Sequence, residues 1–157
     1  MTQPAIDLAP DAQTAIAEAL TQAVAETAVT TMLAQNFHWN VKGMSFGPLH
    51  ALFQEIYEDH FTAQDDLSER VRALDVHAEG RLSVMLERSK VKEQDGHQSD
   101  QEMIRLLVEA EEILAATLAG AGALAAEHDD TLTEDLAIER GRVHEKFAWM
   151  LRAHLQA

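Results

Sequence analysis

A chain of 157 residues with 46% hydrophobic side chains is long enough for one domain with a single core, and its 7 glycines and 3 prolines are too few for a turn-rich β fold. The formal net charge of −15 disfavours binding to nucleic acid and would concentrate cations near the surface, although such a charge also serves solubility alone. Cysteine is absent, which excludes disulfides and thiolate sites, so any metal must be bound through nitrogen and oxygen.

The sequence carries no signal for export or for a membrane span. Residues 1–4 do not form a basic segment followed by an apolar one. The uncharged runs 27–41 and 113–126 are shorter than the roughly 20 residues that a span requires. We therefore expect a soluble, cytoplasmic protein without membrane contact.

Two long helices are expected in the first half of the chain. The first starts near Pro10 or Asp11 and ends by Gly43, which can adopt the left-handed conformation that closes a helix. The second starts around residues 47–48 and runs to about Leu74. Apolar residues recur at intervals of three and four along both, although threonines interrupt the first stripe; the second stripe comprises Leu49, Phe53, Ile56, His60, Ala63, Leu67, Val71 and Leu74.

The second half of the chain predicts two more long helices after a long connection. Residues 82–87 could form a short helix within that connection. Ser99 and Glu102 form a capping-box pattern that starts the third helix, which ends near Glu127. The fourth follows residues 129–131 and carries Leu132, Leu136, Val143, Phe147, Met150 and Leu151 inward. These elements predict an all-α fold: one four-helix bundle over residues 1–157, with a short extra helix in the crossover between the second and third helices and a short, non-basic N-terminal extension over about residues 1–10.

Asp65 and Glu69 are four residues apart, so both carboxylates project from one face of the second helix and could hold one cation. Such pairs are also common on solvated helices. His50 lies on the same side of that helix, but 15 residues at about 1.5 Å each place it roughly 22 Å from Asp65. Two copies paired antiparallel about a two-fold axis would bring His50 of one chain to the acids of the other, and His38 could join its own His50.

Imidazoles together with carboxylates suit Fe(II) or Zn(II) better than Mg(II) or Ca(II). None of the eight histidines has a glutamate three residues before it, so the Glu-x-x-His motif of di-iron bundles is missing. His144-Glu145 lacks the second histidine of a zinc-protease motif. The sequence therefore disfavours a conventional di-iron centre inside one bundle.

The segment 36–43, Asn-Phe-His-Trp-Asn-Val-Lys-Gly, followed by Leu49-His50, Leu52-Phe53, Asp65 and Glu69-Arg70, strongly resembles Dps, the DNA-binding protein from starved cells, in the ferritin superfamily. The ending over residues 144–152 resembles it too. The resemblance implies a ferritin-like bundle that assembles into a homo-dodecameric shell built from two-fold dimers. It also implies oxidation of Fe(II), preferably by hydrogen peroxide and otherwise by dioxygen, with storage of ferric mineral inside the shell.

The resemblance further implies roles for individual residues. His38 and His50 would come from one subunit, and Asp65 and Glu69 from its two-fold partner, with iron as the bound metal and zinc as a possible occupant. Trp39 would lie beside the centre, where it could shield it, donate an electron, or merely pack at the interface.

Gln54 departs from the pattern, since many relatives have an acid there that helps to hold a second metal. We therefore expect one firm iron position and a weak or water-mediated second one at the shared site.

Three acidic residues at the start of the last helix resemble those lining the family's iron-entry pores, although acids are favoured in any first helical turn; they are Asp130, Glu134 and Asp135. The remaining histidines, at positions 60, 77, 97, 128, 144 and 154, are expected to be core or surface residues rather than ligands.

DNA binding should be weak, because the chain lacks a lysine-rich tail. The alternatives are a non-enzymatic stress or nucleoid shell in which metal only stabilises the dimer, and a helical interaction module without a metal function.

Overall fold

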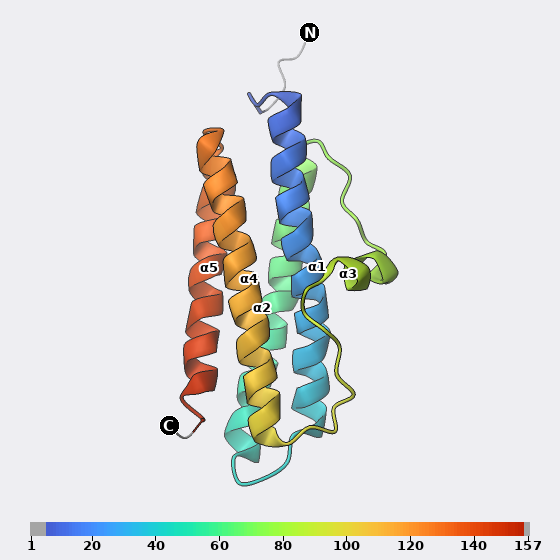
Figure 1. The fold of residues 1–157 in the computed structure, drawn as a ribbon, viewed down its shortest axis with the longest axis vertical. Helices are drawn as coiled ribbons and strands as arrows, with labels where there is room; N and C mark the ends of the chain where they lie inside the picture. Colours follow the sequence, from blue (N-terminus) through green and yellow to red (C-terminus); the bar gives the residue numbers. More distant parts are fainter. Residues whose placement is uncertain (1–5, 156–157) are drawn as a thin grey trace.

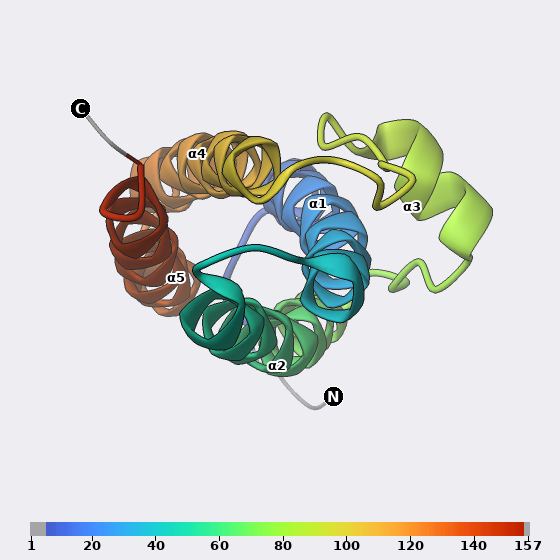
Figure 2. The same cartoon turned by 90° about the horizontal axis from the view of Figure 1, so that it is seen from below.

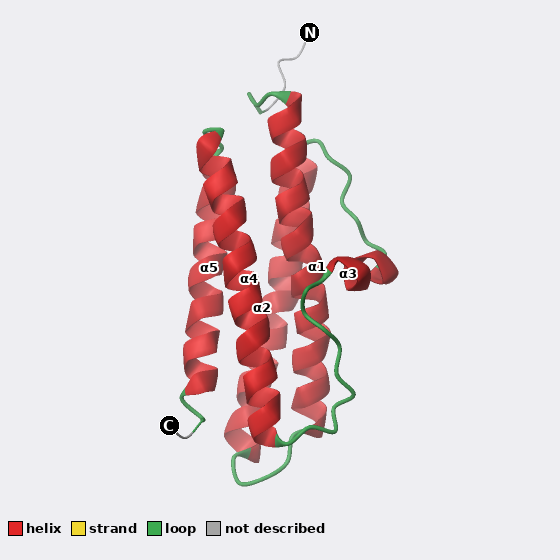
Figure 3. Cartoon of the chain, viewed as in Figure 1, coloured by secondary structure: helices red, strands yellow, loops and turns green. Residues whose placement is uncertain are grey.

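The computed structural model describes residues 6–155 and contains five helices in that range. They are α1 (Pro10–Asn40), α2 (Phe46–Ala73), α3 (Leu82–Arg88), α4 (Asp100–Glu127) and α5 (Thr131–Arg152) (Figure 1). The described residues contain helices and loops and no strand (Figure 3). The predicted all-α class, the four long helices and the short helix in the crossover are confirmed. The predicted extension over residues 1–10 lies partly outside the described residues, and the single-domain boundary stays a prediction.

The four long helices surround one elongated core, in the order α1, α2, α5 and α4 when seen along the bundle (Figure 2). Helices α1 and α2 form one hairpin and α4 and α5 another, and the crossover passes outside α1, where it carries α3. Because this crossover spans the length of the bundle, α2 and α4 run in the same direction (Figure 1). None of the described helices is long and apolar enough to cross a membrane.

The threonines of α1 are accommodated by hydrogen bonds to the helix itself. The hydroxyls of Thr27 and Thr31 donate to the carbonyls of Ala23 and Thr27, each at 2.7 Å. This back-bonding pairs each polar group within its own helix, so Thr27 is fully buried without an unpaired donor. The threonines in the predicted stripe are therefore compatible with a core-facing α1.

The crossover is fastened to α1 by a buried carboxylate. Glu26 is fully buried and accepts hydrogen bonds from the Gln22 amide at 3.1 Å, from the Lys90 backbone N–H at 3.2 Å and from the Thr117 hydroxyl. These donors come from α1, the crossover and α4, so one side chain ties three segments together. A buried charge without a cation depends on such donors to offset its lost hydration.

Side-chain caps define where the last two helices begin. Ser99 accepts a hydrogen bond from the Glu102 N–H at 3.2 Å, and Asp130 accepts one from the Thr133 N–H at 3.2 Å. The predicted start at Ser99 is thereby confirmed. One predicted core position is wrong: Leu132 is 67% exposed, because it lies in the first turn of α5 on the side away from the bundle, whereas Thr133 is buried.

We expect Gly96→Ala to destabilise the fold by about 1–3 kcal/mol. Gly96 has φ of +87°, and a Cβ there would collide with Asn36 Oδ1, the side chain that also donates to the Gln94 carbonyl and so holds the loop to α1. Gly80→Ala is the matched control, since a Cβ there meets nothing within 4 Å. Chemical unfolding followed by tryptophan fluorescence measures both, and equal stability of the two variants would contradict this account.

Candidate metal centres

His38, in the last turn of α1, and His50, in the first turns of α2, hold each other by two reciprocal hydrogen bonds. His38 Nδ1 lies 2.6 Å from the His50 carbonyl oxygen, and His50 Nδ1 lies 2.8 Å from the His38 carbonyl oxygen. A carbonyl oxygen only accepts, so each Nδ1 must carry the proton. The lone pair of each neutral ring is then on Nε2, which is the atom a metal would use.

Aromatic packing fixes the orientation of these two rings. They stack on each other with centroids 3.7 Å apart and planes 15° apart. Phe46 also stacks on His50 at 5.0 Å, and Tyr57 packs edge-on against His38 at 5.2 Å. His38 is buried and His50 is half-buried, and the hydrogen bonds and stacking hold both rings in place at the end of the α1–α2 hairpin.

The chain does not bring Asp65 and Glu69 to this pair. Both are exposed in the C-terminal half of α2, and Asp65 is roughly 22 Å along α2 from His50. Within residues 6–155, no group of three potential ligands includes His38, His50, Asp65 or Glu69. The predicted conflict of distances within one chain is therefore a feature of the structure.

Large apolar side chains are exposed around the histidine pair and along α2. Trp39 follows His38 and is 60% exposed, and Met44 lies fully exposed in the turn that leads to α2. Phe61 is 73% exposed, and at about 100° per residue it lies within about 20° of His50 around α2. A row of exposed apolar side chains of this kind is typical of a protein–protein interface.

The amide of Gln54 donates to Glu58 Oε1 at 2.8 Å, one turn further along α2. Gln54 is half-buried and one turn from His50, so its oxygen is the part of the side chain left for another partner. Gln54, which stands where many relatives have an acidic residue, therefore lies one turn from His50 of the histidine pair.

The three acids at the start of α5 have unlike surroundings. Asp130 is buried, caps α5 and accepts a hydrogen bond from Arg70 Nη2 at 2.8 Å, so one of its oxygens already has a structural role. Glu134 is half-buried and Asp135 is exposed. Their role in a pore stays a prediction, and of the three Asp130 is the most constrained.

A second group of potential ligands lies in the middle of the bundle, where no site was expected. His60 of α2, Glu111 of α4 and His144 of α5 are all fully buried, and their ligand atoms lie within 4.8 Å of one another. His60 Nε2 is 2.7 Å from Glu111 Oε1, and His144 Nδ1 is 2.5 Å from Glu111 Oε2. His60 and His144 are core residues as predicted, but the glutamate between them was not identified.

Asp59 and Arg140 close this buried cluster on one side. Arg140 donates from both terminal nitrogens to Asp59, at 3.2 and 2.7 Å, and His60 Nδ1 lies 2.9 Å from Asp59 Oδ2. His60 thus faces a carboxylate at each nitrogen, which requires both to be protonated. Two carboxylates, one guanidinium and one imidazolium sum to zero charge.

The surroundings shift the pKa values in the directions that this arrangement requires. Burial alone would lower the pKa of His60, but the charge of Glu111 and the hydrogen bonds to Asp59 and Glu111 outweigh it and raise that pKa to about 9. Burial would raise the pKa of Glu111, yet the His60 charge and the two imidazole hydrogen bonds hold it at about 2. The pKa of His144 is lowered, first by burial, so His144 is the neutral member.

The sequence contains one feature that could have indicated this cluster: a charged residue, Glu111, within the apolar stripe of α4. Glu111 lies between Leu107 and Leu114 on α4, at a position that also faces inward. Its partners are 51 and 33 residues away in the sequence, so no local spacing links the three ligands. A buried charge on an inward face nevertheless requires a partner, and inward histidines are the available ones.

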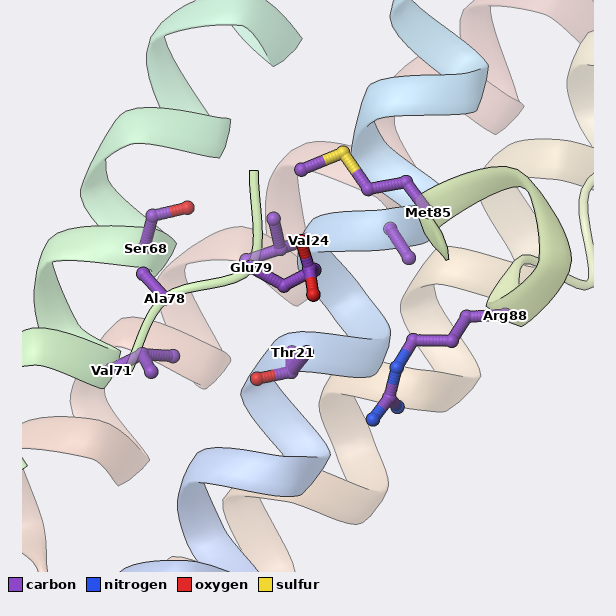
Figure 4. A pocket seen from close by; sticks show the side chains of 9 residues that line it. Thr21, Val24, Ser68, Val71, Ala78, Glu79, Met85 and Arg88 are labelled. Carbon is purple, nitrogen blue, oxygen red and sulfur yellow. The ribbon is translucent and has the colours of Figure 1, made fainter. Parts of the chain in front are cut away.

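A small hollow in the described part of the chain is lined by none of these four histidines. A hollow between α1, α2 and the crossover has a volume of about 10 Å³, which accommodates at most one water molecule (Figure 4). Glu79 and Arg88 lie at its rim together with Met85. This hollow is too small for an organic substrate, whereas an open hollow of about 320 Å³ lies between α4 and α5, where Leu118, Ala137 and Glu145 are among the residues that line it.

Comparison with known proteins places the chain among ferritin-like proteins. The ferritin-like domain model matches residues 17–157. The DNA protection during starvation protein of Brevibacillus brevis is 37% identical over 146 residues, which cover 92% of this chain and 97% of that protein. This chain belongs to the Dps family.

Solved Dps structures have the same fold over nearly the whole chain. The Dps protein of Vibrio cholerae O1 superposes with a TM-score of 0.93 at 31% identity and covers 99% of this chain and 98% of its own. Dps from Microbacterium arborescens, solved in a high iron form, superposes with a TM-score of 0.86 at 29% identity, covering 93% and 95% of the two chains. The family resemblance stated from the sequence is thereby confirmed.

We expect Glu111→Gln to lower the free energy of unfolding by about 3–5 kcal/mol near pH 6, because the buried His60 charge loses the fully buried one of its two carboxylate partners. The His60 contribution is fully present below its ordinary pKa of 6.5 and is lost as the pH rises through about 9. The Glu111 contribution is present above 4.5 and is lost as the pH falls towards 2. The difference in free energy of unfolding between the parent and the Glu111→Gln variant should therefore decrease as the pH rises from 6.5 to 9.

Glu112→Gln is the neighbouring control for this measurement. Glu112 pairs with Arg152 on the surface, where both side chains are about half exposed, so its loss should cost less than about 1 kcal/mol. Urea unfolding at fixed chain concentration and several pH values measures all three proteins. A gap that stays constant between pH 6 and 9 would show that His60 is not the charged member.

Proposed function

We propose that this Dps-family protein oxidises Fe(II), preferably with hydrogen peroxide, at sites shared between two subunits, and stores the ferric product in a hollow shell. The observation that carries the proposal is the reciprocal pairing of His38 and His50, which leaves an Nε2 atom on each ring and no third ligand among residues 6–155 of the same chain. Two imidazoles suit Fe(II) or Zn(II) and do not suit Mg(II) or Ca(II).

A second copy supplies what the histidine pair lacks. Asp65 projects from broadly the side of α2 that also carries His50 and the exposed Phe61, and Glu69 lies one turn beyond Asp65. Pairing two α2 helices antiparallel about a two-fold axis places the acids of each chain near the histidines of the other and covers the exposed apolar side chains. Each dimer then has two equivalent sites, and dimers of this kind are the units of the proposed dodecameric shell.

The ligands of the shared site hold Fe(II) in position while the oxidant removes an electron from it. They perform no acid–base step. Each Fe(II) loses one electron, so one peroxide takes two electrons from two Fe(II) ions and, with two protons, becomes two waters. The His and carboxylate ligands hold the ion as a template and favour the higher charge of Fe(III) through their anionic oxygens. Trp39, exposed in the single chain and next to His38, would shield the site or donate an electron to a reactive oxidant.

The charge of the chain favours traffic of cations over binding of DNA. A net charge of −15 in each subunit attracts Fe(II) to the shell, and Glu134 and Asp135 at the start of α5 are the acids that we expect near an entry pore. The first basic residue is Lys42, so the N-terminal segment offers nothing to displace counterions from DNA. A cytoplasmic location remains a prediction from the sequence.

Mixed shells test whether one site needs two chains. We expect His38→Ala/His50→Ala and Asp65→Ala/Glu69→Ala shells to be inactive when pure, whereas shells co-expressed in equal amounts should regain about a quarter of the parental activity. Half of the randomly formed dimers are mixed, and each mixed dimer has one intact site and one that lacks all its ligands. The rate of ferric absorbance is followed after peroxide is added to anaerobic Fe(II)-loaded shells, with particle mass as the check on assembly.

Each outcome of the mixing experiment is decisive. Mixed shells of normal mass without activity would show that the two ligand pairs do not act across an interface. Pure variants that oxidise iron as fast as the parent would eliminate the proposed site, and would favour a stress or nucleoid shell in which metal only stabilises the dimer. A stable monomer would eliminate the shared site whatever its activity.

Gln54→Glu should increase the Fe(II) bound per subunit and the rate of its oxidation, because a carboxylate one turn from His50 is a stronger ligand than an amide oxygen. Gln54→Ala is the control, since it removes the same contact to Glu58 without adding a charge. Anaerobic Fe(II) titration by calorimetry and stopped-flow absorbance measure both effects. Unchanged stoichiometry and rate in Gln54→Glu would mean that position 54 does not limit a second iron.

A further inference from the structure

We propose that His60, Glu111 and His144 form a second metal site, inside each four-helix bundle, that takes one divalent ion of the Fe(II) and Zn(II) class. The three side chains come from α2, α4 and α5 of a single chain. This site lies about 15 Å along α2 from His50, so it is separate from the shared site. It needs no partner subunit and is independent of the proposed oxidation of Fe(II).

The donor atoms are close to the arrangement that such an ion imposes. Two ligands of a tetrahedral ion with bonds of about 2.1 Å are about 3.4 Å apart. Each imidazole nitrogen lies 2.5 to 2.7 Å from a Glu111 oxygen, and all three donors are within 4.8 Å of one another. Shifts of under about 1 Å in side chains therefore convert hydrogen-bond distances into ligand distances.

Asp59 already holds His60 in the orientation of a metal ligand. His60 Nδ1 donates to Asp59 Oδ2 at 2.9 Å, which turns Nε2 towards Glu111. A carboxylate behind a ligating histidine is the usual support in metal sites, since it fixes the tautomer and increases the basicity of the other nitrogen. Arg140 in turn holds Asp59 through two hydrogen bonds. The supporting shell is therefore present before any ion binds.

The ion replaces a proton. His60 loses the proton on Nε2, and the proton of neutral His144 moves from Nδ1 to Nε2, so that Nδ1 can bind. The His144 Nε2 then faces Arg140 Nη2, which lies 3.4 Å away, and the guanidinium has to shift towards Asp59. Arg140 Nε has no hydrogen-bond partner within the described residues, so this shift breaks no bond at that atom. The summed charge of the five side chains falls from zero to minus one, and with the divalent ion it becomes plus one.

Cobalt(II) is the probe, because its visible absorption distinguishes a tetrahedral protein site from an aqueous octahedral ion. The background is the His38→Ala/His50→Ala/Asp65→Ala/Glu69→Ala protein, expressed in cobalt-supplemented medium and desalted, so that the shared site has lost all four of its ligands. We expect one retained ion per chain with a tetrahedral spectrum, and X-ray absorption should show two imidazole ligands. Adding Glu111→Gln should abolish retention, whereas adding Glu112→Gln should leave it unchanged.

Folding is checked separately by helix content and particle mass in every variant. His144→Gln is the second variant, since it keeps a polar side chain of similar size and removes one nitrogen ligand; it should lower retention at least tenfold. Folded background protein that retains no cobalt would overturn the proposal and leave the cluster as an ion-pair network alone. Equal retention by a folded Glu111→Gln variant would also overturn it, because the ion would then be bound elsewhere.

Discussion

The carboxylate of Glu111 is the constraint around which this bundle is arranged. It has no exposed surface and stays ionised, which is possible only if cationic or hydrogen-bonding groups surround it. His60 and His144 supply those groups from two other helices, so the mutual placement of α2, α4 and α5 is tied to one charge. Helix α1 takes no part in the cluster and is held by apolar packing and by the buried Glu26 instead. The bundle therefore has two buried carboxylates with different partners: Glu111 among the histidines of α2 and α5, and Glu26 between α1, α4 and the crossover.

The His38–His50 pair and the His60–His144 pair differ in which ring nitrogens carry protons, and this decides whether a nitrogen is available to bind a metal ion. In His38 and His50 the Nδ1 protons are donated to backbone carbonyls, so that Nε2 is the atom of each ring that can offer a lone pair to an external ion. In His60 both protons are donated to carboxylates, which keeps the ring charged. The first pair can add a ligand at once. The His60–His144 pair must release the His60 proton before it can bind an ion. We therefore expect it to bind an ion more slowly than the His38–His50 pair, and only an ion whose charge the surrounding carboxylates can offset.

Much of the fold could be read from the sequence because its signals are local. Proline near position 10, the Ser99 cap and the inward stripes lie within single helices, and all four long helices were predicted within a few residues of their bounds. Leu132 was misplaced because periodicity does not show which side a first turn presents. The distance from His50 to Asp65 could be predicted from helical rise alone. The cluster at Glu111 could not, since its members are joined only by the packing of three helices.

Sharing a site between chains couples the chemistry of iron to assembly. The surface that would bring Asp65 to His50 also carries Phe61 and borders Trp39, so the contact that completes the ligand set is the one that buries exposed apolar area. At the His38–His50 pair a single chain offers only two imidazole nitrogens, which bind a divalent ion weakly and give it no anionic ligand to favour the ferric state. Under the proposed arrangement, oxidation starts only after dimers form. The ferric product then appears where a shell can receive it, and free subunits do not generate it in solution.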